Sequence, residues 1–429
     1  MKIHFVGIGG IGVSALARYY LEKGHEISGS DLVSSEITAC LKEKGVKLFI
    51  GKHKIENLAK DTDLLIYSPA VPENNPEIKK AKKLGIKCQT YPQALGELTK
   101  QHFTIAVSGT HGKSTTTSMI GLLLVKAGFD PTIIVGTKLK EFGDSNCRVG
   151  KSKYLVIEAD EWQASFLNYW PKIIVLTNIE KEHMDFFKDM SHVFEVYTKY
   201  LNNLPKDGIL VANKDNQNVR KIAEKIPGSK YYSIEQKESE KLKNILQIPG
   251  EHNVSNALAA LSVAQILEIP DQISFQSLRE YKGSWRRFEI KQLIINKKQI
   301  TIISDYAHHP TEIKVTLKAA REKYPDKKIW CVFQPHQYQR TYYLWDDFVK
   351  TFRQAPVDKL IITDIYDVAG RENQEIKRKA SSEKLIKQID QSWALYLPKN
   401  QIMSYLKQNL EPEDMLIIMG AGDIYKIVS

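Results

Sequence analysis

The stretch TIAVSGTHGKSTTTSMI, residues 104–120, constrains the fold more than any other part of the chain. An apolar run leads into Gly109 and Gly112, Lys113 and Ser114 follow, and a helix-compatible segment comes next. This order is typical of a phosphate site, because glycines let backbone N–H groups converge on an anion at a helix N-terminus. Lys113 adds a mobile positive charge, and the Ser114 hydroxyl suits a phosphate-bound magnesium ion. The stretch therefore predicts a nucleotide phosphate site.

The spacing of this loop departs from the usual P-loop. A standard motif has a glycine five positions before the Gly-Lys pair, where this chain has Val107, so the loop is a shorter G-x-x-G-K-S form. A glycine turn with a surface lysine is the plainer alternative. Strand, glycines, lysine, hydroxyl and helix all occur in order, which favours the phosphate site.

Length and composition indicate a soluble protein of several domains. The chain has 429 residues, more than one ordinary core accommodates. No apolar run approaches the roughly 20 residues of a membrane helix, and the N-terminal residues show no signal-peptide pattern. The four cysteines form no C-x-x-C pair, which argues against a disulfide framework and a zinc site. We expect a cytoplasmic protein.

The net charge of +11 is compatible with two kinds of partner. A basic surface attracts nucleic acid, and it also attracts small substrates that carry phosphates and carboxylates. The lysines are dispersed in amphipathic segments without a dense basic run, so we expect no nucleic-acid partner. The net charge alone does not identify the substrate.

A second glycine turn lies at the N-terminus. Residues 2–6 predict a strand, Gly7, Gly9 and Gly12 follow as G-x-G-x-x-G, and residues 11–23 predict a helix. Residues 25–28 and 64–67 predict two further strands. Asp31 comes about twenty residues later, where an acidic side chain commonly meets a ribose hydroxyl. NAD is one candidate, but the same turn serves any pyrophosphate that approaches a helix N-terminus.

The central segment alternates strands with helices, which predicts a mainly parallel sheet. The strands are expected at residues 104–107, 132–135, 154–158, 173–176 and 208–211. Polar clusters follow two of them, namely Glu158, Asp160 and Glu161, and Asn178, Glu180, His183 and Asp185. Both clusters are expected at the carboxyl edge beside the phosphate loop, where carboxylates could hold magnesium. Helix N-capping by the acidic residues is the alternative.

The last third predicts another α/β sheet. Strands are expected at residues 290–294 and 299–304, and the apolar runs IWCVF, LIIT and MLIIM each end in a polar or glycine-containing loop. The histidine pair in DYAHHPTEI does not indicate zinc, because adjacent residues do not share a helix face and no further ligand is evident. Asn253 near the start of a predicted helix reads, by itself, as a cap.

Taken together, these motifs resemble the Mur ligase family. The resemblance spans the chain and rests on GIGGIG, SGTHGKSTTT, EADE, TNIEKEHMD, GEHNVSNALAA, RRFE, DYAHHPTEI, FQPHQYQRT and MGAGDI. It implies three α/β domains: a Rossmann-like domain at residues 1–99 that binds a UDP-sugar rather than NAD, a P-loop ATPase-like domain at 100–283 that binds ATP, and a Rossmann-like ligase domain at 284–429.

The resemblance also implies an activity. DYAHHPTE and FQPH point to the branch of the family that joins L-alanine to the carboxylate of UDP-N-acetylmuramate in peptidoglycan synthesis, with ATP and Mg²⁺, through an acyl phosphate. A recycling ligase that adds a whole peptide to the same UDP-sugar is the alternative. A monomer or weak homodimer is expected, with no membrane association.

Roles are carried over by motif position. Those implied for ATP are Gly109, Thr110, Gly112, Lys113, Ser114, Thr115, Asn253, Arg286, Arg287 and Asp305. Those implied for the UDP-sugar are Gly7, Gly9, Gly10, Gly12, Asp31, Asn178, Tyr306, His308 and Arg340. Lys113, Glu158 and His183 are the implied catalytic residues, and Ser114, Glu158 and His183 the implied magnesium ligands. Gln337 replaces a frequent arginine and Ala307 a common glycine, which puts the details of substrate fit in doubt.

Chemical logic agrees with the implied activity. A carboxylate is a poor electrophile, so ATP must first convert it into an acyl phosphate, and phosphoryl transfer needs positioning and charge neutralisation more than a protein nucleophile. His183 as a base is an alternative to His183 as a metal ligand. An NAD-dependent reductase would leave SGTHGKS unexplained, and a non-catalytic sensor would not need Lys113, Glu158 and His183 together.

Overall fold

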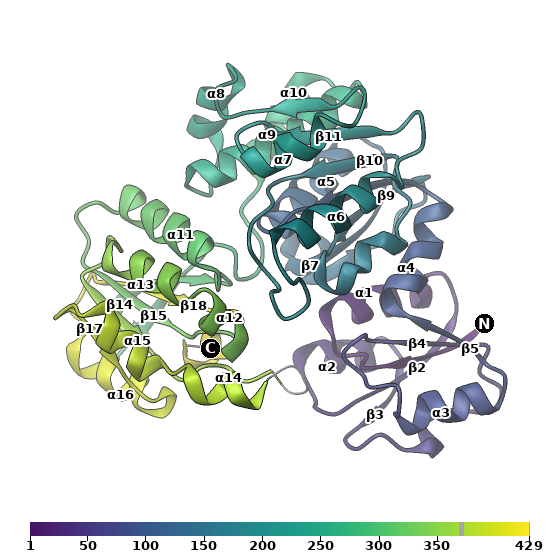
Figure 1. Cartoon of the computed structure of the whole chain (residues 1–429), viewed down its shortest axis with the longest axis horizontal. Coiled ribbons are helices and arrows are strands. Elements are labelled where there is room, and N and C mark those ends of the chain that lie inside the picture. The colour runs from purple at the N-terminus through teal and green to yellow at the C-terminus, as the bar shows by residue number, and fades with distance from the viewer. Residues whose placement is uncertain (369–372, 429) are drawn as a thin grey trace. The chain divides into compact units, whose positions relative to one another are not determined.

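The computed structural model describes residues 1–368 and 373–428 (Figure 1). It contains a five-stranded, a seven-stranded and a six-stranded sheet, each with helices around it. The predicted three-domain α/β fold is therefore confirmed, while the boundaries near residues 99 and 283 stay predictions. Among the described residues, no helix has both the length and the apolar character needed to cross a membrane.

The chain forms two compact units. The first comprises Met1–Ile179, Phe194–Ser233 and Ala257–Leu278, and holds the five-stranded and seven-stranded sheets. The second comprises Glu180–Val193, Ile234–Asn256 and Arg279–Ser429, and holds the six-stranded sheet.

The five-stranded sheet of the first unit is fully parallel, in the order β3-β2-β1-β4-β5. Its strands are β1 (Lys2–Val6), β2 (Glu26–Asp31), β3 (Lys47–Ile50), β4 (Leu64–Tyr67) and β5 (Lys87–Thr90), and its helical segments are α1 (Ile11–Glu22), α2 (Glu36–Glu43), η1 (Ile55–Asn57), α3 (Pro76–Lys83) and α4 (Tyr91–Lys100). The strand order reverses beside β1. Ligands of open parallel sheets bind at such a point, and the N-terminal glycine turn lies there.

The seven-stranded sheet has the order β12-β11-β10-β6-β9-β7-β8 and is parallel except for β8. Its strands are β6 (Phe103–Ser108), β7 (Thr132–Leu139), β8 (Ser145–Arg148), β9 (Tyr154–Ala159), β10 (Ile173–Leu176), β11 (Ile209–Asn213) and β12 (Lys230–Tyr232). Strand β6 lies between β9 and β10. The polar clusters after β9 and β10 therefore follow the two strands that flank the phosphate-loop strand, as predicted.

Helix α5 (Lys113–Lys126) begins directly after the phosphate loop and is buried along most of its length. Ser114–Gly121, Leu123 and Leu124 are all buried, so the helix needs apolar or small residues on every side rather than on one stripe. The other helical segments between β6 and the last third are η2 (Lys140–Phe142), η3 (Trp162–Asn168), α6 (Met190–Leu201), α7 (Gln217–Ala223), α8 (Glu238–Ile245), α9 (Glu251–Ile266) and α10 (Asp271–Glu280).

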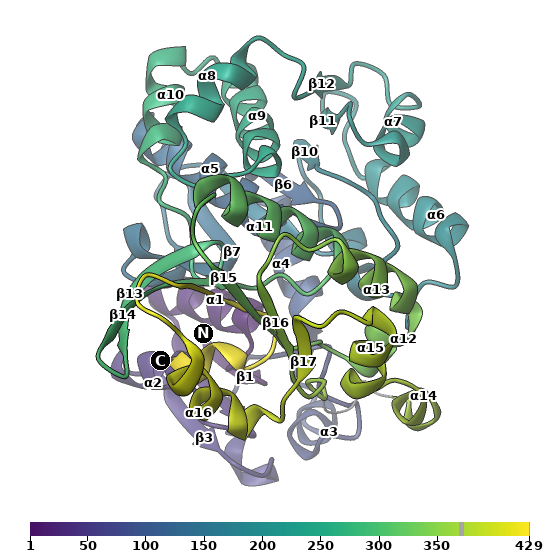
Figure 2. The same ribbon diagram turned by 90° about the vertical axis from the view of Figure 1, so that its left-hand side faces the viewer.

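The six-stranded sheet of the second unit has the order β13-β14-β18-β15-β16-β17, with β13 antiparallel to β14 and the other neighbours parallel. Figure 2 shows the hairpin of β13 and β14 at its edge. The strands are β13 (Glu289–Ile295), β14 (Lys298–Asp305), β15 (Ile329–Phe333), β16 (Lys359–Ile362), β17 (Ala394–Tyr396) and β18 (Met415–Met419).

Two apolar clusters cover the faces of this sheet. One includes residues of α11 (Pro310–Lys323), α13 (Trp345–Arg353) and α15 (Ser382–Ile389). The other includes residues of α16 (Lys399–Asn409) and η4 (Ile424–Val428). The short helices α12 (Tyr338–Tyr343) and α14 (Gln374–Lys379) complete the unit. The segments after β14 and β15 carry the predicted residues Tyr306, His308 and Arg340, and β18 lies between these two strands in the sheet.

Candidate functional site

The phosphate loop has a backbone that requires glycine at two positions. Gly109 has φ 132° and Gly112 has φ 80°. A Cβ atom on Gly109 would lie 2.1 Å from Thr177 Oγ1, so no other residue fits without displacing the neighbouring strand end. Helix α5 begins at Lys113 with no acidic residue in its first turn, which leaves its positive end available to an anion. The predicted order of strand, loop and helix is confirmed.

Asn178 holds this loop in shape. Its Oδ1 accepts a hydrogen bond from the His111 N–H at 2.8 Å, and its Nδ2 donates to the His111 carbonyl at 3.1 Å. Its backbone carbonyl accepts from the Thr110 N–H at 3.0 Å. Both ends of the amide are thus used on the loop itself. The predicted contact of Asn178 with substrate stays a prediction.

Lys113 folds back over the loop towards a buried carboxylate. Its Nζ donates to Glu161 Oε2 at 2.9 Å, to the Gly109 carbonyl at 2.6 Å and to the Thr110 carbonyl at 3.2 Å. Burial favours the neutral amine, but Glu161 and Asp160 more than offset this and hold the pKa of Lys113 above its ordinary value. Burial also raises the pKa of Glu161 to about 7, against the opposing charge of Lys113. The ammonium group therefore stays charged at the position where a phosphate would lie.

Three carboxylates lie at the carboxyl end of β9, Glu158 within the strand and Asp160 and Glu161 directly after it. Glu158 accepts a hydrogen bond from the Gly136 N–H at 2.6 Å, Asp160 lies 4.0 Å from Lys113 Nζ, and Glu161 is buried beside it. Hard divalent cations take oxygen ligands of this kind, and Mg²⁺ at a nucleotide site needs only one or two from protein. Ser114 is buried in the first turn of α5, and its role as a hydroxyl ligand stays a prediction. The carboxylate and hydroxyl oxygens at this edge of the seven-stranded sheet are the kind of ligand that magnesium prefers.

The backbone N–H groups of the N-terminal glycine turn already have acceptors within the protein. Gly7 and Ile8 donate to the Ser30 carbonyl, Gly10 donates to the Gly7 carbonyl, and Gly9 donates to Asp31 Oδ2 at 2.8 Å. Asp31 therefore shapes the turn, and its predicted contact with ribose stays a prediction.

The first turn of α1 is different from the glycine turn that precedes it. Its N-cap residue Gly10 has no capping side chain, and the N–H groups of Ile11, Gly12 and Val13 donate to no described residue. Three unpaired amides at a positive helix end make an anion site. The amides that no described residue occupies are therefore those of α1, and the predicted contacts of Gly7, Gly9, Gly10 and Gly12 with a UDP-sugar stay predictions.

In the second unit, Arg286 and Arg287 occupy different environments. Arg286 is 3% exposed, has φ 55°, and donates to the Gly420 carbonyl while its guanidinium faces the rings of Tyr306 and Tyr425. Burial lowers the pKa of Arg286. Arg287 is only partly buried, and its guanidinium carbon lies 4.8 Å from the centre of the Tyr306 ring. Of the two, Arg287 has the more accessible guanidinium.

Asp305 at the end of β14 organises the neighbouring loop. Its Oδ2 accepts from the Phe288 N–H at 2.7 Å, and its Oδ1 accepts from the Ala307 N–H at 2.8 Å. Burial raises the pKa of Asp305 to about 6, although Arg287 opposes the shift. Both carboxylate oxygens already have backbone partners, so the predicted ribose contact stays a prediction.

His308 lies among rings and carboxylates of the same unit. Its Nδ1 is 3.1 Å from the Tyr306 carbonyl and 3.4 Å from Glu312 Oε2, and its ring meets the Tyr306 ring edge to face at 5.4 Å. Burial lowers the pKa of His308 to about 3. The imidazole is therefore neutral near pH 7 and suited to hydrogen bonding rather than to charge.

Arg340 is tied to a carboxylate that the sequence interpretation left out. Its Nε donates to Glu182 Oε1 at 2.9 Å, and its Nη1 donates to the His336 carbonyl at 2.9 Å. Burial opposes the charge of Glu182, but Arg340 and then the nearby histidines hold its pKa well below the ordinary value. Next to it, His183 has the left-handed φ of 55°. Such strain in a non-glycine residue is concentrated at functional sites.

Asn253 and Gln337 are both buried. Asn253 Nδ2 donates to the Pro249 carbonyl at 2.7 Å, which ties the start of α9 to the preceding turn. Gln337 is 3% exposed with φ 73° and precedes α12. The adenine contact implied for Asn253 stays a prediction.

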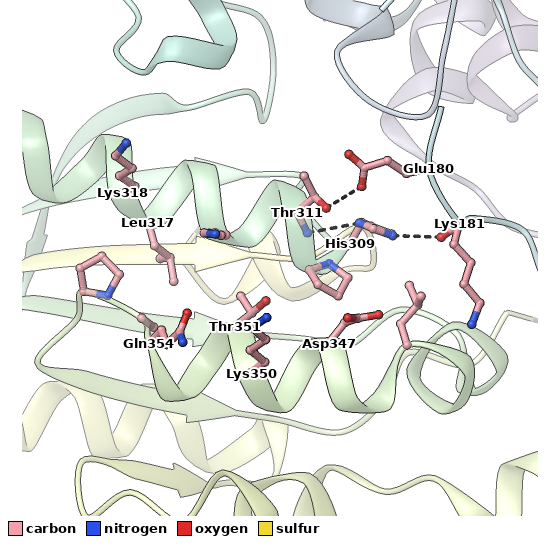
Figure 3. A pocket seen from close by; sticks show the side chains of 15 residues that line it. Glu180, Lys181, His309, Thr311, Leu317, Lys318, Asp347, Lys350, Thr351 and Gln354 are labelled. Carbon is pink, nitrogen blue, oxygen red and sulfur yellow. Dashed lines mark hydrogen bonds between the residues drawn. The ribbon is translucent and has the colours of Figure 1, made fainter. Parts of the chain in front are cut away.

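A cavity of about 470 Å³ lies in the second unit between α11 and α13 (Figure 3). Thr311 Oγ1 donates to Glu180 Oε2 at 2.6 Å, and His309 Nε2 lies 3.2 Å from the Lys181 carbonyl at its inner end. Lys314, Lys318 and Lys350 line the cavity and are exposed. The residues for which the sequence predicts a role in ATP or UDP-sugar binding do not line it, so the cavity does not support the predicted chemistry.

Three family profiles match the chain in succession. Residues 2–103 match the profile described as "Mur ligase family, catalytic domain", residues 107–264 match "Mur ligase middle domain", and residues 286–422 match "Mur ligase, glutamate ligase domain". Together they cover most of the sequence and follow the three sheets in order.

Curated relatives are similar over the full length. The UDP-N-acetylmuramate--L-alanine ligase of Acetivibrio thermocellus is 43% identical, with 99% of this chain and 94% of the relative covered. The enzyme of the same name from Clostridium acetobutylicum is 40% identical, with 99% and 96% covered.

Solved structures resemble the fold. The UDP-N-acetylmuramate-alanine ligase of Thermotoga maritima has a TM-score of 0.81 at 26% identity, covering 99% of this chain and 97% of that one. A murein peptide ligase of Psychrobacter arcticus has a TM-score of 0.74 at 22% identity, covering 100% of this chain and 97% of that one, and shows the fold alone.

Proposed function

This chain belongs to the Mur ligase family, and we propose that it is an ATP-dependent ligase that joins L-alanine to the carboxylate of UDP-N-acetylmuramate. Two curated relatives of that name, at 43% and 40% identity over 99% of the chain, support this substrate pair. The product would be a precursor of peptidoglycan made in the cytoplasm.

One structural observation carries the proposal. In the first unit, Lys113 at the start of α5 has its Nζ 2.9 Å from Glu161 Oε2. Glu158 lies near the end of β9, and Asp160 follows that strand directly. A charged lysine, a helix N-terminus and oxygen ligands together form a site for a nucleotide triphosphate and its magnesium ion. The same unit has a second anion site at the uncapped start of α1, which suits the diphosphate of a UDP-sugar.

The reaction would proceed in two steps. A carboxylate oxygen of the UDP-sugar attacks the γ-phosphorus of ATP, ADP leaves, and an acyl phosphate forms. The amine of L-alanine then attacks the acyl carbon, and the tetrahedral intermediate collapses with loss of inorganic phosphate and a proton. Lys113 neutralises charge on the transferred phosphoryl group, and the amides at the start of α5 orient it. Both effects lower the barrier without a protein nucleophile.

Magnesium, when bound, would shield the phosphate charges, with Ser114 and Glu158 of the first unit as its proposed ligands. In the second unit, Arg287 is the proposed contact of the nucleotide phosphates, because the guanidinium of Arg286 already contacts the Gly420 carbonyl and three aromatic rings. His308, neutral near pH 7, would donate or accept a hydrogen bond from the UDP-sugar. Arg340 would bind substrate through the part of its guanidinium that Glu182 and His336 leave unused.

The test is an omission series on the purified full chain. Inorganic phosphate is expected only when ATP, Mg²⁺, UDP-N-acetylmuramate and L-alanine are all present. Glycine, serine and a stem tripeptide are then offered in competition with L-alanine. Preference for the tripeptide would favour the recycling ligase instead. Release of phosphate in the absence of UDP-N-acetylmuramate would contradict a ligase of either kind.

A further inference from the structure

Tyr91 connects the two anion sites of the first unit, and no sequence motif singled it out. It is the first residue of α4, where Thr90 Oγ1 accepts from the Gln93 N–H and the Gln93 side chain accepts from the Thr90 N–H. Pro92 further restricts the backbone of this first turn. The backbone at Tyr91 is therefore held by a complete capping box.

The ring lies against the first turn of α1. A Cβ atom on Gly12 would be 2.8 Å from Tyr91 Cζ and 3.0 Å from its hydroxyl oxygen, so glycine is needed there for close approach of the ring. Gly12 is one of the three residues whose N–H groups donate to no described residue. The phenol hydroxyl thus sits beside the unpaired amides of α1.

Tyr91 is partly buried, and its hydroxyl makes no hydrogen bond to another described residue. Burial, and then the negative charges of Glu158 and Asp160, raise the pKa of Tyr91, so the phenol stays protonated and can donate. Neither carboxylate accepts from it. A donor near unpaired amides and without a protein acceptor is suited to an anionic oxygen of a ligand.

The two sheets of this unit are fixed to each other at the same place. The Asn146 amide on β8 donates to the Ile11 carbonyl at 2.5 Å and to Ser14 Oγ at 2.9 Å, both in the first turn of α1. Gly96 of α4 allows a close contact with the Asn168 carbonyl of η3. Tyr91, the start of α1 and the carboxylates after β9 therefore keep a common arrangement.

From this arrangement we infer that Tyr91 is a substrate-binding residue whose hydroxyl donates a hydrogen bond to the diphosphate held at the start of α1. The inference rests on the proposed function, because it takes the ligand of that site to be a uridine diphosphate. It assigns the diphosphate a side-chain donor in addition to the amides of Ile11, Gly12 and Val13. The hydroxyl would also orient the ligand on the side that faces Glu158.

The experiment measures binding of UDP to the full chain by titration calorimetry, without ATP or L-alanine. Tyr91→Phe keeps the ring on Gly12 and removes only the hydroxyl, so its melting temperature should match the wild type. Its affinity for UDP should fall about tenfold, the loss expected for one hydrogen bond to a charged group. Tyr154→Phe is the matched control, because it removes a phenol oxygen at the opposite end of the strand that carries Glu158.

The outcomes separate the two claims. An affinity of Tyr91→Phe for UDP within about twofold of the wild type and of Tyr154→Phe would overturn the inference and leave the proposed function standing. Absence of UDP binding by the wild type would contradict the proposed function itself, and the inference with it.

Discussion

Lys113 and Glu161 form an ion pair at the start of α5, with Nζ 2.9 Å from Oε2 and the Glu161 side chain 3% exposed. Lys113 Nζ also donates to the Gly109 and Thr110 carbonyls of the phosphate loop. Entry of a phosphate would replace one anionic partner of Lys113 by another, so the buried ammonium never lacks a counter-charge.

Lys113→Ala is expected to reduce turnover by about a thousandfold, the scale found when a preorganised electrostatic contact to the transition state is lost. The fold should persist, because the buried Glu161 carboxyl, whose pKa is already raised to about 7, takes up a proton once Lys113 is removed. Lys126→Ala, exposed at the other end of α5, is the control and should keep wild-type activity. Steady-state phosphate release and circular dichroism check both. Substantial activity in Lys113→Ala would mean that the loop is not the phosphate site.

Gly109→Ala should abolish measurable ATP binding, because the new Cβ would collide with Thr177 Oγ1 2.1 Å away and the residue must keep φ 132°. Gly128→Ala provides the comparison: it also has positive φ, but nothing lies within 4 Å of the new Cβ. That control should lose only about 1 kcal/mol of stability, the cost of a left-handed non-glycine residue. Calorimetric titration with ATP measures both. Equal ATP affinity in the two variants would refute the steric argument.

Arg286→Ala and Arg287→Ala should give different phenotypes. Removing Arg286 leaves a buried space lined by Tyr306 and Tyr425 and an unpaired Gly420 carbonyl, so the free energy of unfolding should fall by about 3 kcal/mol. Removing Arg287 should change stability by less than about 1 kcal/mol and raise the KM for ATP about tenfold. Chemical denaturation and kinetics at varied ATP separate the two. The reverse pattern would reassign the phosphate contact to Arg286.

The lowered pKa of His308 predicts an acid-sensitive contribution to stability. Its pKa is about 3 in the folded chain, against an ordinary value of 6.5. Below pH 6.5 the unfolded chain takes up a proton at His308 and the folded chain does not, so the free energy of unfolding falls as the pH falls. Above pH 6.5 this loss is absent. Between pH 6.5 and 5 the loss is about 2 kcal/mol. His308→Gln should remove that part of the pH dependence. Denaturation midpoints that fall equally in both proteins would contradict a neutral His308.

The strands that the sequence did not predict are short and lie at the edges of their sheets, whereas the predicted edge strand β13 has seven residues. Central strands such as β6, β10 and β18 are runs of buried apolar residues, which parallel sheets require on both faces. The five strands that the sequence did not predict are β3, β5, β8, β12 and β17, and each lies at the edge of its sheet. An edge strand of three or four residues pairs on one side only, so its sequence carries little hydrophobic pattern.

The site was predictable where a local motif determines it and not where distant segments meet. The glycines, Lys113 and Ser114 were found because strand, loop and helix follow one another. Glu161 was found only as one of several carboxylates, because its contact with Lys113 joins residues 48 positions apart and no local motif predicts it. Glu182 and Arg340 are 158 residues apart, and nothing local predicts their ion pair.

The most direct measurement of the proposed mechanism follows an oxygen atom. UDP-N-acetylmuramate with oxygen-18 in its carboxylate is incubated with the full chain, ATP, Mg²⁺ and L-alanine, and the phosphate is examined by mass spectrometry. If the carboxylate attacks the γ-phosphorus and L-alanine then displaces phosphate from the acyl phosphate, each phosphate carries one labelled oxygen. Unlabelled phosphate accompanied by the amide product would contradict the account.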